Sequence, residues 1–288
     1  MASIDKFAVF ILTHGRPDNV VTYRTLEQQG YTGKVYIIVD NEDDTVPKYR
    51  KRYGDKVIEF DKLAISKTFD TADNFDDRRT AVYARNASVM IAEDLGLDYF
   101  LELDDDYTAF VYKFDASLRY AERRVKDLDK LFSLMLEYYS KSDAVSIAFA
   151  QNGDFIGGRE ATFASAVKTK RKCMNTFFCS TSQPFSFVGR VNEDVNTYVA
   201  LGHKGKLFLT VNPVAIIQRP TQSNPGGYTD VYLKEGTYRK SFYTVMFAPS
   251  CTTIALMGST HQRLHHKINW NCAVPCIVDE QWQKEGDM

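Results

Sequence analysis

The chain has 288 residues, of which 44% are hydrophobic and 25% are charged, and its formal net charge is −1. This composition is typical of a globular protein, and the near-neutral charge excludes a surface that is basic throughout, so nucleic acid would need a local basic patch. No apolar run approaches the roughly 20 residues that a membrane span needs. The five cysteines, without a secretory signal, predict reduced thiols in a cytoplasmic protein.

The first hundred residues alternate between apolar runs and helix-like stretches. Buried strands are expected at residues 7–12, 34–40, 56–60 and 99–103, and helices at residues 17–30 and 76–96. This alternation predicts an α/β fold with a doubly wound sheet, in which ligands bind beyond the carboxyl ends of the strands.

The remainder of the chain gives a less regular pattern. A helix is expected at residues 126–140, a strand at 144–150, a strand, turn and short helix within 185–202, one or two strands at 206–218, and a helix within 229–247. Residues 151–183 and 219–230 are predicted to be loops. No internal repeat or clear linker divides the sequence, so we expect a single domain over residues 1–288.

Polar residues come directly after three of the predicted strands. Thr13 and Arg16 follow the first strand, Asp40 ends the second, and Asp104–Asp106 follow the fourth. Because the carboxyl ends of parallel strands meet at one edge of a sheet, we expect these residues to lie together at a ligand site.

The acidic triplet, in the stretch LELDDDY at residues 101–107, is the most informative of these motifs. Asp104 and Asp106 are two positions apart, so in an extended segment their side chains point the same way. Carboxylate oxygens are the ligands that Mg²⁺ and Mn²⁺ prefer, and a cation would offset the repulsion within the cluster. A solvated acidic turn after a strand is the alternative.

A second acidic motif is the pair Glu193 and Asp194 in VNEDVNTY. Adjacent helical residues point about 100° apart, so only one of the two can face a substrate comfortably. The alternative is a purely structural role in the first turn of a helix capped by Asn192.

Histidines and basic residues supply further candidates. His265 and His266, in HQRLHHK, could complete a metal shell or contact a diphosphate, although surface or core histidines are more common. The basic segment Lys168, Lys170, Arg171 and Lys172 is followed by aromatic residues, a pattern typical of contact with phosphates and stacked bases, or of an ordinary solvated loop.

Taken together, these motifs resemble those of GT-A glycosyltransferases. The buried strand that ends in THGRP, Asp40, the D-D-D triplet, the E-D pair and a late histidine occur in that order. The second half, with RPTQSNPGGYTDVYLKEGTYRKSFYTVMFAPS, HHKINW and VPCI, resembles the TET-associated glycosyltransferases of large tailed phages. The resemblance extends from about Phe7 to Glu280.

The resemblance implies a Rossmann-like GT-A fold with a mixed central sheet, in which residues 1–110 bind the nucleotide sugar and residues 111–288 bind the acceptor. It implies transfer of glucose or a pentose such as arabinose from a UDP-sugar to 5-hydroxymethylcytosine, or a related hydroxymethylpyrimidine, in phage DNA. The location would then be the host bacterial cytoplasm.

The resemblance also implies roles for single residues. Thr13, Arg16 and Asp40 would border the nucleoside, and Arg85 would approach the diphosphate. The metal, Mn²⁺ or Mg²⁺, would be held by Asp104, Asp106 and His265 or His266, with Asp104 also near the ribose and Asp105 near the sugar or a supporting group. Asp194 or Glu193 would be the base of an inverting reaction, and the segment from Lys168 to Lys172 would contact DNA.

Two other functions use the same motifs. A glycosyltransferase acting on a glycan or a protein fits the near-neutral charge of the chain. A metal-dependent phosphohydrolase or nucleotidyltransferase could use the same acidic cluster without any sugar acceptor.

Overall fold

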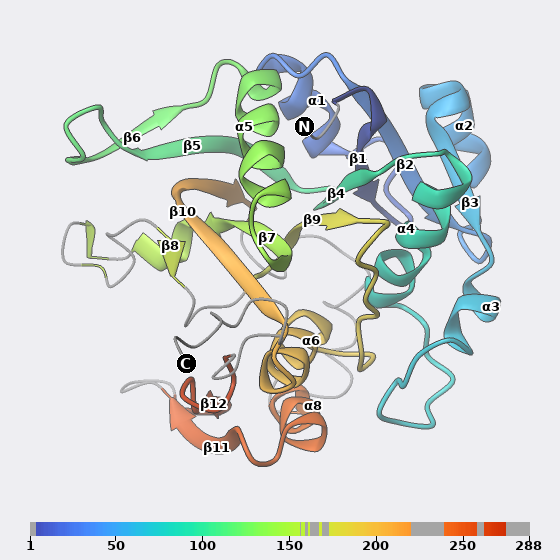
Figure 1. Cartoon of the computed structure of the whole chain (residues 1–288). Coiled ribbons are helices and arrows are strands. Elements are labelled where there is room, and N and C mark those ends of the chain that lie inside the picture. Colours follow the sequence, from blue (N-terminus) through green and yellow to red (C-terminus); the bar gives the residue numbers. More distant parts are fainter. Residues whose placement is uncertain are drawn as a thin grey trace, which may run out of the picture.

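The computed structural model describes residues 4–155, 157–158, 161, 167–168, 173–219, 239–257 and 262–274. Within these ranges, one large sheet is flanked by helices (Figure 1). Its strands are β1 (Phe7–Leu12), β2 (Lys34–Asp40), β3 (Val57–Phe60), β4 (Tyr99–Asp104), β5 (Tyr107–Phe114), β6 (Tyr120–Arg124), β7 (Ala144–Gln151), β8 (Val167–Lys168), β9 (Thr176–Ser180) and β10 (Leu207–Gln218).

The helices are α1 (Val21–Gln28), α2 (Val46–Tyr53), α3 (Lys62–Ser66), α4 (Val82–Asp94), α5 (Leu128–Ser140), α6 (Glu193–His203) and α8 (Arg239–Phe247), with short 3₁₀ turns η1 (Ile4–Lys6), η2 (Gly54–Lys56) and η3 (Asn152–Phe155). A separate hairpin of β11 (Thr252–Met257) and β12 (Arg263–Ile268) lies beside α8 (Figure 1). Among the described helices, none has the length and apolar character required to cross a bilayer.

The strand order of the large sheet is β3-β2-β1-β4-β9-β7-β10-β5-β6, with β8 paired to β10. Strands β3, β2, β1 and β4 run parallel to one another, whereas β9 is antiparallel to both β4 and β7. The predicted α/β fold with a mixed central sheet is therefore confirmed. Because the first four strands are parallel, their carboxyl ends lie along one edge, and that edge carries the polar residues predicted from the sequence.

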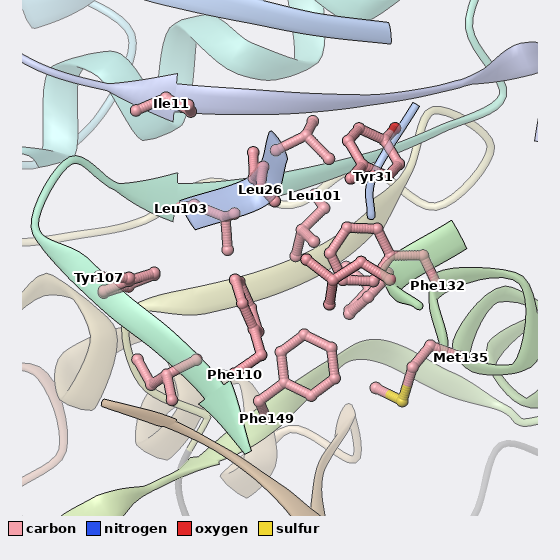
Figure 2. Close-up of a cluster of buried hydrophobic side chains, with 14 of the residues drawn as sticks. Ile11, Leu26, Tyr31, Leu101, Leu103, Tyr107, Phe110, Phe132, Met135 and Phe149 are labelled. Carbon is pink, nitrogen blue, oxygen red and sulfur yellow. The ribbon is translucent and has the colours of Figure 1, made fainter. Parts of the chain in front are cut away.

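Alternate side chains of β1 pack into two hydrophobic clusters. Phe7, Val9 and Ile11 belong to a cluster with residues of α1, α2 and α5. Figure 2 shows part of this cluster, with Phe132 and Met135 of α5 facing side chains of the sheet. Ala8, Phe10 and Leu12 belong to a second cluster with residues of α3, α4 and α6. Since a strand projects alternate side chains to opposite faces, helices cover both faces of the sheet, which explains the continuous apolar pattern of β1.

Hydrogen bonds join α1 to the segment that follows β4. Thr22 Oγ1 donates to the carbonyl of Asp104 at 2.6 Å and accepts from the backbone N–H of Tyr107 at 2.9 Å. Gln29 Nε2 donates to the carbonyls of Phe110 and Val125 at 2.9 and 2.6 Å. The bonds of Thr22 therefore hold the acidic turn between β4 and β5 against α1, and those of Gln29 hold the end of α1 against β5 and the segment after β6.

Two helix boundaries differ from those predicted. The first helix begins at Val21 rather than at residue 17, and the helix predicted at 76–96 begins at Val82. In the second case, aspartate side chains bond to the backbone two residues ahead, as Asp73 Oδ1 does with Phe75 N and Asp77 Oδ1 with Arg79 N. Such local bonds compete with helical hydrogen bonds, so the segment before Val82 forms a loop.

Two strand predictions were also wrong. Strands β8 and β9 lie within residues 151–183, which were predicted to be a loop. The apolar TFFCS run of β9 is too short to stand out as a strand in the sequence. The strand expected at the start of residues 185–202 does not form, although the helix that follows does form as α6.

Candidate active site

The first polar group of the site lies where β1 and β4 end side by side. Thr13 Oγ1 donates a 2.6 Å hydrogen bond to Oδ2 of Asp105, while Arg16 Nη1 lies 3.3 Å from Oδ1. The hydroxyl of Tyr49 lies 2.9 Å from Thr13 Oγ1 and accepts the backbone N–H of Arg16 at 2.8 Å. Both oxygens of Asp105 are therefore engaged by protein groups, which agrees with a supporting role for this residue.

The turn after β1 depends on Gly15. Its φ of +70° lies in the left-handed region that glycine adopts without strain. Its N–H donates a 2.6 Å hydrogen bond to the buried carboxylate of Asp43, which follows β2. This contact fixes the turn that carries Thr13 and Arg16 against the end of the neighbouring strand.

A second polar group surrounds Asp40 at the end of β2. His14 Nδ1 and Lys62 Nζ lie 2.8 and 3.2 Å from the same carboxylate oxygen, and the other oxygen accepts the N–H of Glu42. Burial alone would raise the pKa of Asp40, but the bonds from His14 and Lys62 outweigh it and hold that pKa below its usual value. Lys62 was missed in the sequence, although its position just after β3 places it at the same edge.

The acidic turn places Asp104 and Asp106 half-buried and Asp105 buried. The alternation agrees with the i, i+2 spacing of Asp104 and Asp106, which predicts that their side chains point to the same side. Burial and the neighbouring carboxylates Glu193 and Asp105 raise the pKa of Asp104 to about 6, against the opposing effect of Arg85. Burial, Asp104 and Asp105 raise the pKa of Asp106 to about 7. In both residues burial is the larger cause of the shift, and the neighbouring carboxylates add to it.

Arg85 of α4 lies at the centre of a buried ion cluster. Its Nη2 lies 3.0 Å from Asp104, its Nη1 3.3 Å from Glu102, and its Nε 3.2 Å from Glu193. Each of the three guanidinium nitrogens thus contacts a different carboxylate. The predicted approach of Arg85 to a diphosphate stays a prediction. Glu102, which lies inside β4, belongs to the same cluster.

The adjacent acids at the start of α6 point to different neighbours. Glu193 contacts Arg85, whereas Asp194 accepts the backbone N–H of Val195 at 2.7 Å. Asp194 also lies near the thiol of Cys173, whose pKa is raised mainly by burial and to a smaller extent by Asp194. Asn192 occupies the N-cap position without a side-chain capping bond, and its amide donates instead to Thr244 of α8 at 2.7 Å. The side chain of Asn192 therefore does not cap the helix.

The two late histidines lie on β12. They pair across the hairpin with Ala255 and Ile254, and His265 Nδ1 lies 2.8 Å from the carbonyl of His266. Among the described residues, no three His, Cys, Asp or Glu side chains are arranged as a set that could hold a metal ion. The structure therefore does not bring His265 or His266 into such a set with the acidic turn, and their role stays a prediction.

The predicted DNA-binding segment is described only in part. The backbone of Lys168 lies in β8 and pairs with Thr210 of β10. Lys170, Arg171 and Lys172 lie outside the described residues, as does most of the predicted loop at 219–230. Their contact with DNA stays a prediction.

The donor set of the acidic turn fits a divalent cation. Asp104 and Asp106 are both half-buried on either side of the buried Asp105, so both can share one side of the turn. Mg²⁺ is commonly bound through one or two protein carboxylates together with substrate phosphates, so two carboxylates are sufficient on the protein side.

Comparisons with known proteins give the chain a family. No curated protein matches the sequence. Among solved structures, glucosyl-3-phosphoglycerate synthase from Mycobacterium tuberculosis, in complex with Mn²⁺, UDP and phosphoglyceric acid, is 10% identical with a TM-score of 0.46, over 91% of this chain and 87% of that one. TarS of S. aureus is 12% identical with a TM-score of 0.44, over 73% of this chain and 59% of that one.

The sequence itself gives the more specific result. The model of the TET-associated glycosyltransferase family matches residues 7–227, which is most of the chain. The match includes the first four strands, the acidic turn and the Glu193–Asp194 pair. The chain belongs to the TET-associated glycosyltransferase family.

Proposed function

We propose that this glycosyltransferase moves a sugar, glucose or a pentose such as arabinose, from a UDP-sugar to 5-hydroxymethylcytosine or a related hydroxymethylpyrimidine in DNA, with Mn²⁺ or Mg²⁺ as cofactor. The family match over residues 7–227 carries the proposal, because it includes both acidic motifs of the site. The acceptor follows from the resemblance to the phage members of this family.

The donor would bind at the carboxyl edge of β1, β2 and β4. Thr13, Arg16 and Asp40 would border the nucleoside. Thr13 and Arg16 follow β1 and Asp40 ends β2, and these two parallel strands are neighbours in the sheet. Asp104 and Asp106 would hold the cation, which when bound would stabilise the negative charge that develops on the departing UDP. This assigns donor binding to residues 1–110 and leaves acceptor binding to residues 111–288.

Asp194 is the better placed of the two candidate bases. The carboxylate of Glu193 contacts the guanidinium of Arg85 at 3.2 Å, so it is already engaged by a protein group. Asp194 is next in the first turn of α6 and points to different neighbours. A carboxylate at this position would accept the proton of the hydroxymethyl oxygen as that oxygen attacks the anomeric carbon.

The proposed reaction inverts the anomeric carbon. A primary alcohol is a weak nucleophile when free, so correct positioning would supply much of the rate. A single in-line attack, with Asp194 on the acceptor side and the acidic turn on the donor side, forms one new bond to the anomeric carbon as the bond to UDP breaks. A product that keeps the donor's configuration, measured by NMR, would contradict this part of the proposal.

The test of the function is an incubation with DNA that contains hydroxymethylcytosine, Mn²⁺ and a panel of UDP-sugars. After digestion, mass spectrometry of the nucleosides would identify the acceptor and the sugar together. DNA with unmodified cytosine is the matched control. UDP release without a modified nucleoside would mean that the sugar passes to water and would contradict the DNA acceptor.

A further inference from the structure

We infer that Arg85 and Glu102 are positioning residues that fix the acidic turn relative to the first turn of α6. The inference rests on the proposed function, in which Asp104 binds the cation of the donor and the start of α6 supplies the base for the acceptor. It concerns residues that do not touch the substrate themselves. It departs from the predicted contact between Arg85 and the diphosphate.

The contacts of Arg85 connect three separate elements. The side chain rises from α4, is 2% exposed, and reaches Glu102 and Asp104 on β4 and Glu193 on α6. A guanidinium is planar and presents its N–H groups in fixed directions, so three carboxylates bound to it acquire fixed relative positions. A Lys ammonium also has three N–H groups, but they share one nitrogen on a flexible stem and do not reproduce the spacing of the three guanidinium nitrogens.

Aromatic rings enclose the guanidinium of Arg85. Its central carbon lies 5.1 Å from the ring centroid of Phe177 on β9 and 5.7 Å from that of Phe187, which precedes α6. Both phenylalanines are almost fully buried. Cations are attracted to aromatic faces, and the attraction is stronger away from water. The rings therefore limit the orientations open to the guanidinium and keep its bonds directed at the carboxylates.

The first turn of α6 is held from two sides. On one side Glu193 contacts Arg85, and on the other Asn192 donates to Thr244, whose hydroxyl donates to Asn196. Asp194 lies in the same turn, directly after Glu193 and two residues before Asn196. Its position relative to Asp104 is therefore set through Arg85, and a displacement of about 1 Å in a reacting geometry can cost on the order of 10²-fold in rate.

Glu102 completes the arrangement without reaching the site surface. It is 1% exposed and lies within β4, two residues before Asp104. Its contact with Arg85 holds the guanidinium on the β4 side. Because Glu102 is almost fully buried, it does not present its carboxylate to a substrate, and its contact with Arg85 connects it to the site.

The test compares Arg85→Lys, Glu102→Met and Glu102→Gln with the wild-type chain. Gln keeps an oxygen that accepts a hydrogen bond from Arg85, whereas Met keeps the volume and removes the acceptor. Arg79→Lys is the matched control, because Arg79 pairs with Asp77 in the loop before α4. The readouts are kcat for UDP release from the donor, the Kd of UDP with Mn²⁺, and hydrogen exchange of the first turn of α6.

A positioning role predicts that Arg85→Lys and Glu102→Met lower kcat by about tenfold or more, change the Kd of UDP by less than about threefold, and do not add in the double variant. Both speed hydrogen exchange at the start of α6, while Glu102→Gln and Arg79→Lys resemble the wild-type chain. The inference would be overturned if Arg85→Lys weakened UDP binding while Glu102→Met kept the wild-type kcat and hydrogen exchange at the start of α6 stayed unchanged.

These readouts separate the inference from the proposed function. UDP release and UDP affinity require no DNA, and hydrogen exchange requires no activity. A chain that modifies some other acceptor would contradict the DNA proposal and leave the role of Arg85 testable. If Arg85→Lys does not fold, the contrast between Glu102→Met and Glu102→Gln still decides.

Discussion

Asp40 and Lys62 form a buried ion pair, with 3.2 Å between Nζ of Lys62 and Oδ2 of Asp40 and with 4% of the Lys62 side chain exposed. His14 contacts the same oxygen from the turn after β1. The pair therefore ties α3 to the end of β2, where the nucleoside is proposed to bind.

Replacement of Lys62 by Met should destabilise the fold. Removing one partner of a buried pair leaves the other charge poorly compensated, and we expect a loss on the order of 2–4 kcal/mol in the free energy of unfolding. Lys67→Met, at the exposed end of the same helix, is the control. Urea unfolding measures both, and a Lys62→Met value equal to that of Lys67→Met would show that the pair contributes nothing.

Asp106→Asn should impair metal binding more than folding. The change removes one of two carboxylates assigned to the cation, and we expect the Kd of Mn²⁺ in the presence of UDP to rise at least about tenfold. Calorimetric titration provides the measurement, and Asp55→Asn at an exposed 3₁₀ turn serves as the control. Unchanged Mn²⁺ affinity would remove Asp106 from the metal site.

Asp194→Asn should lower turnover strongly while the donor still binds. Loss of a general base typically costs about 10²–10⁴-fold in rate. We expect kcat to fall within this range and the Kd of UDP to stay close to the wild-type value. Glu193→Gln is the comparison, and it should be the milder variant. If it proves the more severe one, with Asp194→Asn active, Glu193 is the base.

The loop before α4 should show a pH-dependent contribution to stability. Hydrogen bonds from Arg79 lower the pKa of Asp77 to about 2, against burial. A pKa below the unfolded value means that the contribution is present above about pH 4 and is lost as the pH falls toward 2. Asp77→Asn should therefore lower the Tm at pH 7 and have little effect near pH 2. A Tm difference that is constant across this range would contradict the prediction.

Charge reversal of the basic segment should weaken DNA binding selectively. Replacing Lys170, Arg171 and Lys172 by Glu removes the proposed phosphate contacts, so affinity for DNA should fall and its salt dependence should become shallower. UDP release without DNA should be unchanged. Equal DNA affinity in the variant and the wild-type chain would remove this segment from the proposed interface.

The sequence was most informative where one rule decided the structure. The apolar run of β1 and the acids at the ends of β2 and β4 predicted the parallel strands and the edge that collects polar residues. The i, i+2 spacing also predicted that Asp104 and Asp106 share a side. In these segments the apolar pattern and the spacing of the acids both follow from strand geometry, so the local sequence is sufficient to predict the structure.

The partners of the charged residues could not be predicted in this way. Arg85 meets Glu193 across 108 positions, and Lys62 meets Asp40 only because α3 follows β3 at the same edge. The delayed start of α4 depends on aspartate side chains that bond to nearby backbone. Such contacts depend on tertiary packing or on local competition for hydrogen bonds, which apolar periodicity does not report.

The central claim is transfer of a sugar to hydroxymethylated DNA by the acidic site. Its most direct test is the mass of the hydroxymethylcytosine nucleoside after incubation of duplex DNA with Mn²⁺, a UDP-sugar and either the wild-type chain or Asp194→Asn. We predict that the wild-type chain adds one sugar residue to that nucleoside and that Asp194→Asn leaves it unmodified. An unmodified nucleoside with every UDP-sugar, from a folded wild-type chain that binds UDP, would contradict the claim.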